Sequence, residues 1–117
     1  MQIHIRTDNH VHAGTLEREG IAQRIHDTLD RFANQITRVD VHLADVNGPK
    51  GGSNDVRCLV EVRVAHRDPI TASHQAGGLD EAFVGALERA FRVIETSLAR
   101  RHDAKGPQVS AGGAQVI

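Results

Sequence analysis

The residues with the greatest potential for chemistry are one cysteine, a set of eight histidines and a glycine-rich turn. Cys58 lies in an alternating run between Val56 and Val60 and has the parity of the apolar side chains. A cysteine in that position is predicted to be a small buried hydrophobe rather than a nucleophile. The chain has no Gly-x-Ser-x-Gly motif, and the turn 48–52 lacks the spacing and the Ser/Thr of a phosphate-binding loop. We therefore expect neither catalytic residues nor a cofactor.

The histidines contain one closely spaced pair, His10 and His12. This pair falls in a predicted loop, and no further Cys, His or Asp follows at a familiar zinc spacing. His4 and His42 are expected on one polar surface, where they could meet across strands. We interpret the histidines as scattered surface residues without a metal site. A histidine-based metal or pH sensor is a weaker alternative.

Basic residues recur at helical spacing in two segments. Arg89, Arg92 and Arg100 fall within about 80° of one another on a helix, away from its apolar stripe. Arg101 extends this surface towards the C-terminus.

An earlier predicted helix carries a second line of basic residues. Arg24 and Arg31 are seven residues apart, with Arg38 just beyond the helix. Acidic residues are mixed among the arginines of both helices, so an ordinary solvated surface explains the pattern as well as a phosphate-contacting one does. If the surface is functional, two helices side by side would suit RNA that is recognised by shape and backbone.

Composition narrows the classes of partner. The formal net charge is −1, from 14 basic and 15 acidic residues, which argues against a domain held on nucleic acid by bulk charge, and we expect no DNA partner. No segment approaches the roughly 18 apolar residues of a membrane span, and the N-terminus lacks the apolar core of a signal peptide. A single cysteine excludes an intramolecular disulfide. We expect a cytoplasmic protein without a membrane partner.

The periodicity of apolar residues predicts six elements. Alternation indicates strands at 2–7, 36–46 and 56–64, and a shorter strand at 70–75. Thr15 is the expected N-cap of a helix that ends near residue 34, and a second helix is expected to begin at residue 79. The turn Asn47–Gly52 joins the two long strands into a hairpin.

The order strand, helix, three strands, helix predicts an α+β domain, β-α-β-β-β-α, at residues 1–103. Each helix has one apolar stripe, so we expect both helices to pack on one face of a four-stranded sheet. The other face would be solvated and would display His4, Arg6, Arg38, Asp40, His42, Arg57, Glu61 and Arg63. Residues 104–117 lack periodicity and are predicted to be a disordered C-terminal tail.

Three segments resemble the ribosome hibernation promoting factor family, also called ribosome-associated inhibitor A or sigma-54 modulation protein. They are the strand Ile36–Leu43, the hairpin Asp45–Gly52 and the strand Asp55–Arg63, and the second helix is similar to the family's C-terminal helix. The resemblance covers roughly residues 1–103 and corresponds to the family's short type.

The resemblance implies a double-stranded-RNA-binding-domain-like fold and a non-enzymatic, stress-related function. Family members bind the small ribosomal subunit, with its 16S rRNA, between head and body and thereby inhibit translation by idle ribosomes. On this hypothesis we expect a monomer or weak homodimer. The basic residues predicted to contact RNA are Arg24, Arg31, Arg38, Arg89, Arg92, Arg100 and Arg101, with Lys50 as an auxiliary contact.

The last helix departs from the family's dense run of Lys and Arg. Residues 93–100 here read Val-Ile-Glu-Thr-Ser-Leu-Ala-Arg, and each missing phosphate contact weakens binding to RNA. The alternative function is therefore a protein-interaction or stress module that has kept the fold without the ribosome.

Overall fold

A computed structural model describes residues 1–8, 11, 13–46 and 56–105, with only the backbone for residue 16 and residues 99–105. The predicted order β-α-β-β-β-α is confirmed, with one additional short 3-10 helix after the first α-helix. The elements are β1 (Gln2–Thr7), α1 (Thr15–Leu29), η1 (Asp30–Phe32), β2 (Ile36–Asp45), β3 (Val56–Val64), β4 (Ile70–Ala76) and α2 (Leu79–Lys105). Within these ranges no helix has the length and apolarity that crossing a membrane requires.

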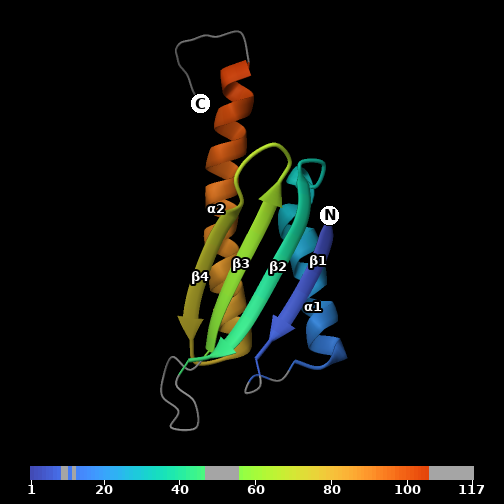
Figure 1. Cartoon of the computed structure of the whole chain (residues 1–117), viewed down its shortest axis with the longest axis vertical. Helices are drawn as coiled ribbons and strands as arrows, with labels where there is room; N and C mark the ends of the chain where they lie inside the picture. Colours follow the sequence, from blue (N-terminus) through green and yellow to red (C-terminus); the bar gives the residue numbers. More distant parts are fainter. Residues whose placement is uncertain (9–10, 12, 47–55, 106–117) are drawn as a thin grey trace.

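The strands form one mixed sheet in the order β1-β2-β3-β4 (Figure 1). β1 is parallel to β2, since α1 carries the chain back to the starting end, whereas β3 and β4 are each antiparallel to the preceding strand. Both α-helices lie on one face of this sheet (Figure 1). The predicted hairpin is thus present as the β2–β3 pair, although its turn, Asn47–Gly52, lies outside the described residues.

The core lies between the sheet and the two helices. Val39, Val41 and Leu43 of β2 are fully buried, as are Cys58, Val60 and Val62 of β3, so the predicted apolar face is confirmed. The helices add a buried stripe of Ile21, Ile25, Leu29, Ala82, Phe83, Ala86, Leu87, Ala90, Ile94 and Leu98. Burial of these aliphatic side chains supplies the main free energy that holds the two layers together.

A register shift at the start of β2 explains why Ile36 is buried out of phase with Val39. The shift lies between Ile36 and Arg38, where the Thr37 hydroxyl donates to the carbonyl oxygen of Arg63 at 3.2 Å. The extra residue puts Ile36 and Val39 on the same face of the sheet, which simple alternation does not allow.

Several element ends differ from the predictions. The helix predicted to end near residue 34 divides into α1, which ends at Leu29, and η1, which ends at Phe32, while β2 ends at Asp45 and β4 at Ala76. Gly14, not Thr15, is the N-cap of α1, and no side chain caps this helix. Thr15 is instead its first helical residue. α2 continues to Lys105, two residues past the predicted domain boundary at 103, and residues 106–117 of the predicted tail lie outside the described part.

Candidate nucleic-acid interface

The arginines predicted to bind RNA lie on two opposite sides of the molecule. Arg24 on α1 and Arg89 and Arg92 on α2 are exposed on the helix side. Arg38 lies on the solvated sheet face, because it alternates with the buried Val39 and Val41. Arg100 and Arg101 belong to α2, but their side chains, like Lys50, lie outside the described residues. The structure therefore does not join all predicted contacts into one surface.

Arg31 is held in a contact between the helices. Its Nη1 donates to Glu95 Oε2 of α2 at 3.4 Å, and its guanidinium lies 4.8 Å from the ring centroid of Phe32. The Phe32 ring in turn lies 6.3 Å from the ring of Phe91, at an interplanar angle of 53°. Arg31 thus packs η1 against α2, and a phosphate would have to compete with Glu95 for it.

Arg24 lines a groove of about 310 Å³ between the first halves of α1 and α2. Apolar side chains, Ile21 and Phe83 among them, form part of its lining, together with the carboxylates of Glu17 and Asp80. The positive charge of Arg24 is therefore opposed by two carboxylates in its surroundings.

The described helix surface carries more acidic than basic side chains. Of the described side chains on the helices, four exposed arginines stand against eight exposed carboxylates. The acidic residues are Glu17, Glu19, Asp27, Asp30, Asp80, Glu81, Glu88 and Glu95. Electrostatics alone therefore does not favour the binding of a polyanion to this part of the helix side.

The open sheet face has the opposite balance. The strand register places four arginines and two carboxylates on it, which are Arg6, Arg38, Arg57, Arg63, Asp40 and Glu61. No described element covers this face (Figure 1). The predicted solvated face is thus confirmed. It carries an excess of arginine, and of these arginines only Arg38 was predicted to bind RNA.

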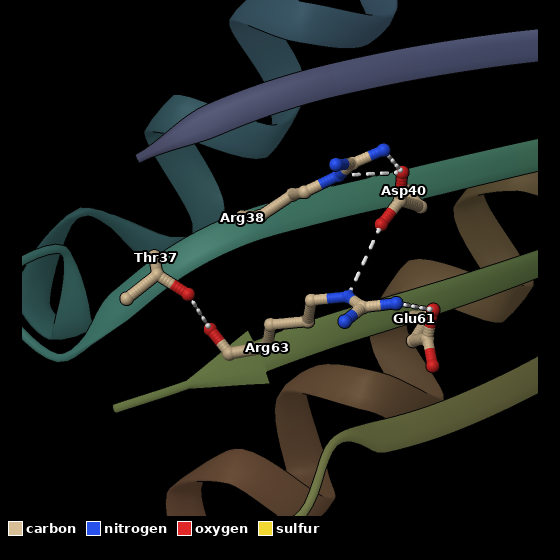
Figure 2. A network of polar contacts seen from close by, with 5 residues as sticks. All are labelled: Thr37, Arg38, Asp40, Glu61 and Arg63. Atoms are coloured by element: carbon tan, nitrogen blue, oxygen red, sulfur yellow. Dashed lines mark hydrogen bonds and ion pairs between the residues drawn. The ribbon is translucent and has the colours of Figure 1, made fainter. Parts of the chain in front are cut away.

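Four of these six residues form a continuous ionic network, in the order Arg38, Asp40, Arg63, Glu61 (Figure 2). Arg38 contacts Asp40 Oδ1 with both Nε and Nη2 at 2.9 Å. Arg63 Nε lies 3.7 Å from Asp40 Oδ2, and its Nη2 donates to Glu61 Oε1 at 3.4 Å. Two guanidinium groups and two carboxylates balance, so this network, which we call the paired cluster, carries no net charge.

Arg6 and Arg57 are exposed on the other part of the same face. Arg6 pairs in register with His42, and Arg57 lies across from Ala44 on β2 and from Gln75 on β4. Neither arginine has an ion pair with any described residue. His4 pairs with Asp40, so His4 and His42 are diagonal rather than direct neighbours.

Cys58 is fully buried, as predicted, and burial raises the pKa of its thiol to about 12. A thiol with this pKa is not a nucleophile near neutral pH. The described residues contain no group of three or more side chains suited to a metal ion, while His10 and His12 fall outside them.

No protein-family model and no curated protein sequence matches this chain. Solved structures do match its fold. The N-terminal domain of Protein Y from Thermus thermophilus aligns with a TM-score of 0.67 at 14% identity, over 83% of this chain and 99% of that domain. A ribosomal subunit interface protein from Coxiella burnetii aligns with a TM-score of 0.60 at 14% identity, over 87% of this chain and 98% of that protein.

The Coxiella burnetii protein is named as a ribosomal subunit interface protein, which agrees with the ribosomal family that the sequence resembles. At 14% identity the match demonstrates a shared fold. The predicted resemblance is therefore confirmed at the level of the fold.

Proposed function

We propose that this protein is a non-enzymatic, ribosome-associated translation inhibitor that acts in the cytoplasm by binding 16S rRNA of the small subunit. The observation that carries the proposal is the match to a ribosomal subunit interface protein, over 98% of that chain, and to the N-terminal domain of Protein Y, over 99% of that domain. A shared fold does not by itself define a function, so the choice of RNA as the ligand depends on the surface residues.

Exposed arginines support RNA as the ligand. Arg24, Arg89 and Arg92 are predicted contacts that are exposed on the helix side and have no ion pair with a described residue. Arg31 and Arg38 already have carboxylate partners, so we rank them as secondary contacts. Arg100, Arg101 and Lys50 remain predicted contacts outside the described side chains.

The test is co-sedimentation of the purified protein with 30S subunits and with 70S ribosomes over a salt series. We expect binding at low salt that weakens as salt rises, with a log–log slope of about one unit per phosphate contact. The double variant Arg89→Ala/Arg92→Ala should bind more weakly and with a shallower slope. Thr96→Ala, an exposed neutral change on the same helix, is the matched control. A wild-type protein that stays in the supernatant at low salt would refute the proposal.

The acidic excess on the described helix surface favours one second candidate. A protein-interaction module with this fold would use that surface against a basic partner. Capture from a ribosome-depleted lysate separates the two candidates. A basic partner protein that Glu88→Gln/Glu95→Gln releases, with no ribosome binding by the wild type, would support the module.

A further inference from the structure

We propose that one half of the open sheet face is a phosphate-binding surface for RNA. This surface, the Arg6–Arg57 half, consists of Arg6, His42 and Arg57, with Ser73 and Gln75 of β4 beside them. The choice of RNA as the polyanion rests on the proposed function. The location of the surface rests on the strand register and on the ion pairs of the sheet.

Register brings these side chains together from all four strands. Arg6 pairs with His42, and His42 pairs with Leu59, which in turn pairs with Ser73. Arg57 and Gln75 form the adjacent row, two residues from Leu59 and Ser73. The Cα atoms of Arg6 and Arg57 are therefore separated by two strand spacings, about 10 Å, and by one side-chain repeat, about 7 Å. Two flexible guanidinium groups at this separation can contact different phosphates of one RNA strand.

Charge distinguishes this half from the rest of the face. Arg38 and Arg63 form ion pairs with Asp40 and Glu61 within the paired cluster. A phosphate there would compete with carboxylates already in place. Arg6 and Arg57 have no such carboxylate among the described residues. The next acidic residue along β1 is Asp8, and its two carboxylate oxygens accept the backbone N–H groups of Val11 and Asp45 at 3.0 Å.

The chemistry of the half suits an acceptor-only ligand. Arginine, serine, glutamine and histidine side chains all have hydrogen-bond donors, and phosphate oxygens accept hydrogen bonds. An RNA backbone presents successive anions, so separate phosphates can engage the two arginines at once. None of the five residues of this surface is a Phe, Tyr or Trp, which favours contacts to the backbone rather than to a base sequence.

The experiment compares three variants for binding to 30S subunits and to a fluorescein-labelled RNA hairpin. Arg6→Gln/Arg57→Gln removes the proposed contacts. Arg63→Gln/Glu61→Gln breaks the paired cluster without changing the net charge. Arg24→Gln/Arg31→Gln also removes two positive charges, but from the helix side. Circular dichroism confirms that each variant is folded.

We expect Arg6→Gln/Arg57→Gln to weaken hairpin binding by about tenfold or more and to flatten the salt slope by about two units. The charge-neutral variant Arg63→Gln/Glu61→Gln should stay within about threefold of the wild type.

Wild-type binding that Arg6→Gln/Arg57→Gln leaves unchanged would overturn this inference while leaving the proposed function standing. Hairpin binding that depends on Arg6 and Arg57, without any binding to 30S subunits, would support the surface and refute the ribosomal function. Competition by poly-glutamate at the same concentration as by RNA would assign the surface to acidic proteins and also overturn the inference.

Discussion

Arginines of equal formal charge differ in this protein through the groups beside them. Arg38 has a carboxylate oxygen at 2.9 Å from two of its nitrogens, whereas Arg6 and Arg57 have no described ion-pair partner. A guanidinium that already satisfies a carboxylate gains little from a phosphate, because one charge-assisted contact is exchanged for another. Exposure and local pairing together, rather than the count of basic residues, decide which arginines are available to a ligand.

Cys58 permits a prediction at the scale of one residue. Its thiol has a raised pKa of about 12 in the folded protein, against 9.0 for the unperturbed group, because it is desolvated. Iodoacetamide at pH 8 should therefore leave the folded protein unmodified and should alkylate Cys58 fully in denaturant.

The same shift makes stability depend on alkaline pH. Because the folded pKa is raised, the stabilising effect is complete below about pH 9 and is lost as pH rises, since only the unfolded thiol ionises there. Between pH 8 and pH 10 we expect a loss of about 1 kcal/mol in the free energy of unfolding from this group. Cys58→Ala is the control, because it lacks the titrating thiol. Equal pH dependence of the two proteins in urea unfolding would contradict the prediction.

At the scale of elements, two helical glycines differ in the space that a side chain would have. A Cβ on Gly85 of α2 would overlap the imidazole ring of His74 on β4, whereas a Cβ on Gly20 of α1 would meet nothing within 4 Å. We expect Gly85→Ala to destabilise the protein by about 1–3 kcal/mol through overpacking, despite the better helix propensity of alanine. Gly20→Ala should stabilise it by about 0.5–1 kcal/mol.

Thermal unfolding measures both variants, and His74→Ala combined with Gly85→Ala should recover much of the loss. A similar gain in stability from both glycine substitutions would show that Gly85 is not needed for packing.

Periodicity in the sequence predicts the elements and the two faces of the sheet, since burial repeats every two residues in a strand and every three to four in a helix. It does not predict contacts set by register or by packing. Arg31 and Glu95 are 64 residues apart in the chain, and only the packed helices bring them together. His74 lies against α2, although a polar residue in a weakly alternating strand gives no sign of it.

Pairing also explains why the candidate site was predicted only in part. The alternation of β1 and β3 does place Arg6 and Arg57 on the solvated face. Their importance follows from the pairing of Arg38 and Arg63 with Asp40, however, and that pairing requires the parallel β1–β2 and antiparallel β2–β3 registers. A helix-centred interpretation of the arginines therefore overlooked the sheet.

At the scale of the whole molecule, a formal net charge of −1 conceals two faces of different sign. Among the described side chains, carboxylates outnumber arginines on the helix side, and arginines outnumber carboxylates on the open sheet face. A helix layer about 10 Å thick separates these faces, which exceeds the Debye length of about 8 Å at physiological salt. Each face therefore presents its own charge to a partner, and a low net charge does not argue against binding RNA through the sheet.

This separation predicts that removing one carboxylate will strengthen binding. Asp40 holds both Arg38 and Arg63, and its side chain is only 17% exposed. Asp40→Asn keeps the shape, releases the two arginines and raises the charge of the open face by one. We expect tighter RNA-hairpin binding with a steeper salt slope, because freed guanidinium groups add phosphate contacts. The expected cost in folding stability is about 1 kcal/mol, since both arginines are well exposed to solvent.

Glu61→Gln serves as the matched comparison, because Glu61 contacts only Arg63 in the described network. It makes the same change in net charge while leaving Arg38 and Arg63 beside Asp40. Fluorescence anisotropy over a salt series should therefore rank the affinities as Asp40→Asn above Glu61→Gln above wild type. Equal affinities for the two variants would show that net charge alone governs binding. An Asp40→Asn protein that is folded and binds RNA more weakly than wild type would show that the paired cluster itself forms part of the RNA contact.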